Sequence, residues 1–197
     1  MSALRHVVPS LLLLALVACS RPIVVHPPKD RLEREARMLE AVTRLGQPGD
    51  WLVIRGYHAT DNLVSTLTHA PFSHAAVLDP EQRQVIEAEG SGLHTTSTAD
   101  FVKKAQRLML VRAQWATTPE RQQAAVVKAR SLVGRPYDFA GLVGANAKDR
   151  YYCSELAVAV FGAHVSRSRD HIPLVIPPDQ LHYWGTVVWD SGAILVR

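Results

Sequence analysis

Cys153, in the stretch RYYCSEL, is the residue of this sequence best suited to nucleophilic chemistry. The chain has only two cysteines, and the other, Cys19, lies near its start. A thiol with a pKa of about 8.5 is mostly protonated at neutral pH, so a cysteine nucleophile needs a base, a cation or a helix N-terminus beside it. Residues 153–165 are apolar and predict a buried helix whose first turn would stabilise a thiolate and bind an oxyanion. The alternative is that Cys153 is only a small buried hydrophobic residue.

A base for this thiol has to come from elsewhere in the fold, and His74 has the most suitable context. It opens the otherwise apolar run HAAVL, where packing alone would favour valine or isoleucine. A base held on a rigid strand is what covalent catalysis requires. His94 and most of the other histidines fall in predicted loops or flanking segments. The alternative for His74 is a strand-end histidine that pairs with a neighbouring carboxylate.

Glu87 and Glu89 are the candidates for a third member of the site. The turn DPEQ separates two strand-like runs, 72–79 and 83–90, which predicts an antiparallel hairpin. This pairing would bring Glu87 beside the strand of His74, where its carboxylate could accept the second imidazole N–H and fix the tautomer. Glu89 lies on the same face two residues further on and is a rival for this role. The alternative for both is a solvent-facing strand glutamate.

The order of these motifs resembles that of a known family. SHAAV, VIEA, GRPYDF and YYCSEL together resemble the permuted papain-like amidases of the NlpC superfamily, of the YiiX and YaeF type, over about residues 48–190. In ordinary papain-like enzymes the cysteine helix precedes the histidine strand, whereas here the histidine comes first.

This resemblance implies a fold, a chemistry and roles for individual residues. It implies Cys153 as nucleophile, His74 as base and Glu87 as the residue that orients the base. Tyr137 of GRPYDF and Glu89 are the candidate substrate-binding residues. The resemblance also implies hydrolysis of an amide bond in peptide or peptidoglycan-like material.

Two other functions remain open. The same cysteine could transfer or remove a lipid acyl group, as permuted relatives similar to lecithin:retinol acyltransferase do. The domain could also be a non-catalytic binding module of the cell envelope. No His/Cys cluster has ligand spacing and no phosphate-binding glycine loop is present in the sequence, so we expect neither a metal nor a cofactor.

The elements that would position these residues predict an α+β domain in which an antiparallel sheet packs against a few helices. Pro119 after Thr118, and Gly134 beyond, mark the clearest helix. The proline-rich segment 172–185 is expected to run over the surface. The sequence predicts helices at 31–45, 60–69, 117–134 and 153–165, a helical turn within 96–105 and a short turn at 179–182. It predicts strands at 49–56, 72–79, 83–90, 107–113 and, as two short strands, within 186–197.

The N-terminal segment predicts export and lipid attachment. Residues 1–18 have the pattern of a signal peptide, and the sequence LVAC that ends at Cys19 resembles a bacterial lipobox. We therefore expect lipidation of Cys19, a tether over 19–30 and a single permuted papain-like domain over 31–197. Ser20 after the anchor favours the outer membrane, with the domain facing the periplasm.

The charge pattern argues against one class of partner. The net charge is +4, but the lysines and arginines are scattered instead of forming a stripe with interleaved aromatic residues. We therefore expect no nucleic-acid partner, and a substrate that is a peptide, a peptidoglycan fragment or derived from lipid. The sequence contains no signal for an oligomeric state.

Overall fold

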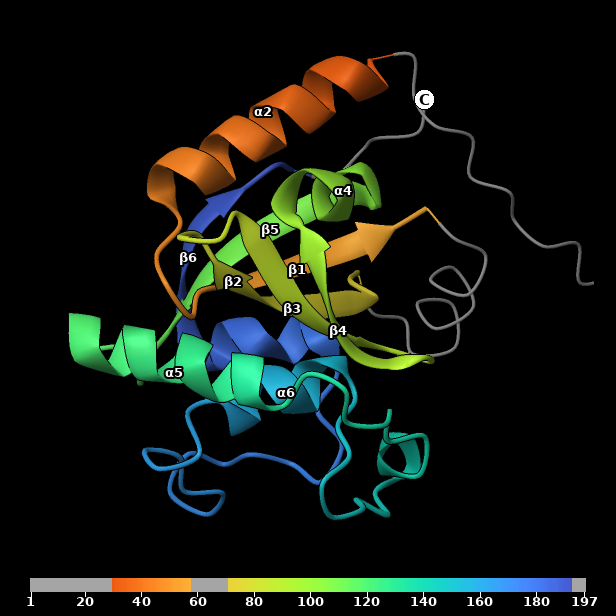
Figure 1. The fold of residues 1–197 in the computed structure, drawn as a ribbon, viewed down its shortest axis with the longest axis vertical. Coiled ribbons are helices and arrows are strands. Elements are labelled where there is room, and N and C mark those ends of the chain that lie inside the picture. The colour runs from red at the N-terminus through yellow and green to blue at the C-terminus, as the bar shows by residue number, and fades with distance from the viewer. Residues whose placement is uncertain (1–29, 58–70, 193–197) are drawn as a thin grey trace, which may run out of the picture.

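The computed structural model describes residues 30–57 and 71–192 (Figure 1). The predicted signal peptide and nearly all of the tether, the predicted helix at 60–69 and the second of the two C-terminal strands lie outside these residues. No helix within the described ranges combines the length and the apolar character that a bilayer-spanning segment needs. The helices are α2 (Arg31–Leu45), α4 (Thr98–Lys103), α5 (Pro119–Ser131) and α6 (Cys153–Ala159), with short 3-10 helices η1 (Gly141–Val143) and η2 (Pro178–Trp184).

The centre of the fold is a six-stranded sheet in the order β4-β3-β2-β1-β5-β6. Every neighbouring pair is antiparallel. The predicted hairpin is confirmed, since β2 and β3 pair in a register that places Ala76 opposite Glu87. The strands are β1 (Trp51–Gly56), β2 (His74–Asp79), β3 (Gln84–Glu89), β4 (Gly92–Ser97), β5 (Ala105–Ala113) and β6 (Gly185–Asp190).

Helices cover both faces of this sheet (Figure 1). Successive side chains of a strand point to opposite faces, and the buried residues accordingly divide into two clusters. One cluster contains Val53, Val77 and Leu156 and includes residues of α5 and α6. The other contains Leu52, Leu78 and residues of α2 and α4. The predicted α+β architecture with an antiparallel sheet is thus confirmed.

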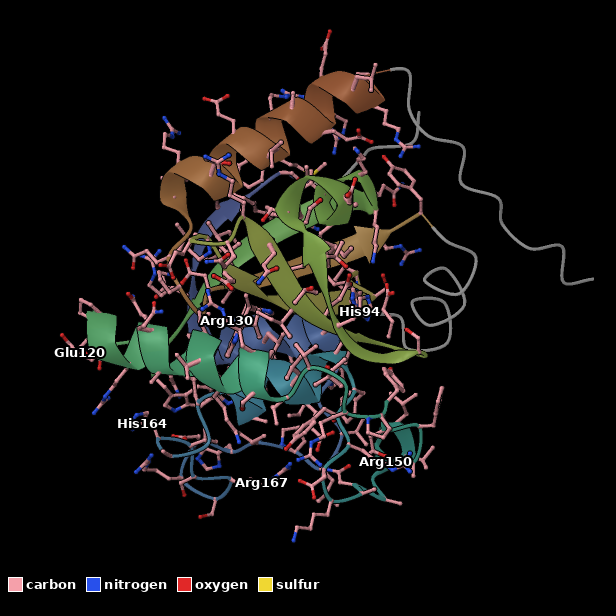
Figure 2. The ribbon with its side chains drawn as sticks, viewed as in Figure 1. His94, Glu120, Arg130, Arg150, His164 and Arg167 are labelled. Atoms are coloured by element: carbon pink, nitrogen blue, oxygen red, sulfur yellow. The ribbon has the colours of Figure 1, made fainter. Side chains whose placement is uncertain are left out.

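Most predicted helix boundaries agree with the structure for identifiable reasons. α2 spans the expected 31–45 and stops where Gly46 leaves the helical region. α5 begins after Thr118, whose hydroxyl accepts a hydrogen bond from the N–H of Arg121. Its Arg130 reaches the tip of the β2–β3 hairpin and bonds both carboxylate oxygens of Asp79 at 2.7 and 2.8 Å (Figure 2).

Three expectations about local structure are wrong. The helix at Cys153 ends at Ala159 instead of residue 165, because the next N–H groups form tighter i to i−3 bonds, such as Gly162 to Ala159. His94 lies on the unpredicted strand β4, not in a loop. The segment 172–185 does not lie wholly on the surface, since Ile176 within it is only 1% exposed.

Candidate active site

His74 is the first residue of β2 and is held by contacts on several sides. Its Nε2 lies 2.7 Å from Oε2 of Glu87, and its ring centroid lies 5.9 Å from that of Phe101. The ring also hydrogen-bonds the sulfur of Cys153. Because Nε2 contacts the carboxylate, Nδ1 is the nitrogen left for the sulfur. The imidazole therefore lies between the predicted nucleophile and the predicted acid.

Cys153 begins α6 and is 7% exposed. The pairing of β2 with β3 ends at Ala76 and Glu87, and the backbone N–H of Ala75, just beyond, hydrogen-bonds the sulfur. The sulfur also lies 4.0 Å from Oγ of Ser154. The thiol is thus placed where the β2–β3 ladder stops, and a main-chain donor faces it.

The charges in this site favour an ionised pair. Burial opposes the imidazolium, but the hydrogen bonds and charges of Cys153 and Glu87 outweigh it and raise the pKa of His74 to about 10. Burial would raise the pKa of Cys153, but the hydrogen bond and the charge of His74 lower it overall. Thiolate and imidazolium therefore stabilise each other, as a nucleophilic cysteine requires.

Glu87, not Glu89, is the acid that contacts His74. The Glu87 side chain is fully buried, accepts a hydrogen bond from the hydroxyl of Thr96 and lies 2.8 Å from Nζ of Lys104. Burial raises its pKa, but His74, Lys104 and Thr96 together lower it to about 2. Glu89 is 41% exposed and bonds Lys104 at 2.8 Å, without a hydrogen bond to His74.

Tyr137, a predicted substrate-binding residue, lies close enough to Cys153 for their charges to interact. Burial and the nearby charge of Cys153 raise the pKa of its hydroxyl. Its ring packs against Phe139 at 4.8 Å between centroids, and its backbone forms an isolated bridge with Tyr151. The contacts with Phe139 and Tyr151 hold Tyr137 in position, and the influence of the Cys153 charge on its hydroxyl shows that the two side chains are near each other.

Sequence reasoning missed three groups of this site. The N–H of Ala75 carries no side-chain signal, because any residue except proline would supply it. Thr96 was missed because the segment was assigned to a helical turn, although threonine is a common strand residue. Lys104 follows another lysine at a helix end, and its partners become apparent only when β3 and α4 are placed in space.

An antiparallel sheet that carries a histidine and an acid on adjacent strands, with a helix that begins at a cysteine beside them, defines the papain-like class. The sequence profile of the permuted papain-like amidase enzymes, the YaeF/YiiX or C92 family, matches residues 47–176. This match covers more than half of the chain, and the chain therefore belongs to that family. The predicted family and its permuted fold are confirmed, and the chain is a member of a family of amide-bond hydrolases.

A solved structure supports the same fold. The chain is similar to the metalloprotein yiiX from Escherichia coli O157:H7, with a TM-score of 0.51 and 23% sequence identity. The similarity covers 61% of this chain and 67% of the other. No curated protein sequence matches the chain.

Proposed function

We propose that this protein is a cysteine amidase that cleaves an amide bond in peptide or peptidoglycan-like substrates. The thiolate of Cys153 attacks the carbonyl carbon, and N–H groups at the start of α6 stabilise the oxyanion. The Nδ1–H of His74 protonates the leaving amine, which departs and leaves a thioester on Cys153. His74 then removes a proton from water, the hydroxide cleaves the thioester, and the acid product is released. Glu87 holds the ring in the tautomer that these steps use.

One observation carries this proposal. A single imidazole, that of His74, hydrogen-bonds both the sulfur of Cys153 and the carboxylate of Glu87. A buried structural cysteine needs neither a paired base nor an oriented one. Tyr137 beside the thiol supports its proposed role in lining the substrate site, and the half-exposed Glu89 is proposed to contact substrate at the edge of the same site.

The test is hydrolysis of peptide and muropeptide libraries, followed by mass spectrometry. Cys153→Ala and Cys153→Ser should abolish cleavage without a change in the circular dichroism spectrum. Cys19→Ser, which removes the only other thiol, should retain cleavage. Cleavage by Cys153→Ala at the parent rate would contradict the proposal. A mass increase on Cys153 with phospholipid, and none with muropeptide, would favour acyl transfer instead.

The residues around His74 do not fit a bound metal ion, because a lysine already occupies the space between the carboxylates. The solved relative is described as a metalloprotein, and here His74, Glu87 and Glu89 offer ligand atoms within 4.8 Å of one another. However, the ammonium of Lys104 lies 2.8 Å from an oxygen of each carboxylate, where it would repel a second cation. The proposed reaction therefore has no step that uses a metal.

The proposed location is the inner face of the outer membrane, through lipid on Cys19. The lipobox-like sequence before Cys19 and the proline-rich segment after it support this. Mass spectrometry of the mature N-terminal peptide should detect acyl chains on Cys19, and Cys19→Ser should release the protein from the membrane fraction. An unmodified Cys19 in membrane-associated protein would contradict this part of the proposal.

A further inference from the structure

Lys104 occupies the space between two carboxylates of one strand. Glu87 and Glu89 are two residues apart on β3 and share a face of the sheet. Nζ of Lys104 lies 2.8 Å from Oε1 of each. The Lys104 side chain is 24% exposed and that of Glu87 is fully buried, so water screens this interaction only partly.

The backbone of Lys104 is fixed, so its side chain has a defined origin. Lys104 caps α4, and its N–H bonds the carbonyl oxygens of Phe101 and Val102. Its own carbonyl accepts a hydrogen bond from the N–H of Tyr57 at 3.2 Å. Its Nζ lies 5.9 Å from the centroid of the Phe101 ring, within the range of a cation–π contact. Contacts therefore hold both the backbone and the side chain of Lys104 in place within the site.

The groups around this ammonium have the donor chemistry of a metal site. His94 lies on β4, directly opposite Glu87 of the neighbouring strand β3 (Figure 2). Its Nε2 is 3.5 Å from Oε1 of Glu87 and 3.4 Å from Oε2 of Glu89. Its Nδ1 lies 3.1 Å from the carbonyl oxygen of Gly92. The contact of Nδ1 with a backbone carbonyl leaves Nε2 facing the carboxylates, the arrangement that metal-binding histidines adopt. His74 supplies a further nitrogen to the same carboxylates.

We infer that Lys104 is a built-in cation that takes the place of a divalent metal ion between Glu87 and Glu89, and that it thereby positions Glu87 for His74. Lys104 and Thr96 both bind Oε1 of Glu87, which leaves Oε2 for the imidazole. The positioning role rests on the proposed function, whereas the exclusion of a metal ion does not.

Zinc titration by calorimetry tests the exclusion directly. The measurements use Cys153→Ala protein, because a thiolate would itself bind zinc. In this background Lys104→Ala should gain one zinc site with an affinity at least about tenfold above that of the parent, since a competing charge is removed. A further Glu89→Gln change should abolish the gain.

Lys103→Ala is the matched control, because this neighbouring lysine is 59% exposed and pairs with the exposed Asp100, away from Glu87 and Glu89. It should gain no zinc site. Equal zinc affinity with and without Lys104, in folded protein, would overturn the inference. Lys104→Gln, which also removes the charge, replaces the alanine variant if the latter does not fold.

A kinetic measurement tests the positioning role. With Cys153 intact, kcat/KM of Lys104→Ala should fall about tenfold, the scale of lost outer-shell support, and added ethylammonium should restore part of it. Ethylammonium should not stimulate the parent or Lys103→Ala. A loss that ethylammonium does not restore would overturn the positioning role. If no variant and no parent protein cleaves any substrate, the proposed function fails, and the zinc titration still decides whether Lys104 excludes a metal.

Discussion

The backbone N–H of Ala75 donates a hydrogen bond to the sulfur of Cys153, and Ala75 directly follows the histidine that pairs with the same sulfur. One strand end therefore supplies both the proposed base and a main-chain donor to the thiolate. Since β2 is buried in the centre of the sheet between β1 and β3, this geometry is tied to a strand that is paired on both sides.

Alkylation of Cys153 by iodoacetamide should remain fast at pH 7. His74 lowers the pKa of the thiol against the opposing effect of burial, so the thiolate persists to lower pH than in free cysteine. His74→Ala removes the main group that opposes the effect of burial, and the pKa of the thiol should then rise above its usual value. The rate at pH 7 should fall by at least about tenfold, one pKa unit. The rate is measured against pH in a Cys19→Ser background, and identical curves for both proteins would contradict the pairing.

The alkaline limit of catalysis should depend on Glu87. The proposed reaction needs a protonated His74, so kcat should fall as pH rises through about 10, the raised pKa of this imidazole. Glu87→Gln removes a charge that raises this pKa, and the fall should move to lower pH. The loss of a correctly oriented base should also lower kcat by about 10²-fold.

Glu89→Gln is the control for this experiment, because Glu89 makes no hydrogen bond to His74. Its alkaline limit should stay close to that of the parent. Identical pH profiles for Glu87→Gln and the parent would show that Glu87 does not act on the base.

Glu155→Gln should stabilise the protein at pH 8. Burial raises the pKa of Glu155 to about 7, although its carboxylate accepts a hydrogen bond from the N–H of Tyr152. A glutamate whose pKa is higher in the folded than in the unfolded state costs stability as pH rises from about 4.5 through 7, because the folded state must lose a proton it would retain. Glutamine keeps an acceptor for the helix cap without this charge.

Urea unfolding at pH 5 and pH 8 tests whether Glu155 lowers the stability of the fold as the pH rises. The parent should lose stability between the two values more than Glu155→Gln does. A larger loss in the glutamine variant would mean that Glu155 acts through its charge in the opposite sense.

Arg112→Met should destabilise the fold. Arg112 on β5 bonds both oxygens of the fully buried Asp50, at 3.0 and 2.8 Å, and the carbonyl of Leu45 at 3.1 Å. Burial raises the pKa of Asp50 even with Arg112 in place. Loss of Arg112 would leave this buried carboxylate without the positive charge and hydrogen bonds that stabilise it. We expect a loss of about 1.5–3 kcal/mol in the free energy of unfolding. Arg121→Met, on the exposed face of α5, should change this free energy much less.

The hairpin and the capped helices could be predicted from sequence because their signals are local. The turn after Asp79 and the strand-like runs on both sides of it fix the β2–β3 register, and Thr118 with Pro119 marks the start of α5. The approach of His74 to Glu87 followed from that register. β4 could not be predicted in the same way, because GLHTTS has no apolar alternation and becomes a strand only through its pairing with β3.

The other features of the fold and the site depend on long-range contacts, and these could not be predicted from the sequence. The choice between Glu87 and Glu89 depends on which carboxylate faces the ring of His74, and two residues on one face of a strand are equivalent in sequence. The end of α6 was misplaced because an apolar run cannot distinguish a continuing helix from buried turns. Lys104 reaches Glu87 only because α4 packs over β3, a contact that no local pattern predicts.

The order in which the chain leaves the ribosome separates the reactive parts in time. His74 and Glu87 are thirteen residues apart and belong to one short hairpin, so they can pair early. The thiol comes from the last third of the chain, and Ser154 beside it is held by the carbonyl of Ile176, which is translated later still. A nascent chain therefore lacks the proposed nucleophile in its final position until almost the whole domain has been made, and we expect C-terminally truncated chains to be inert toward substrate.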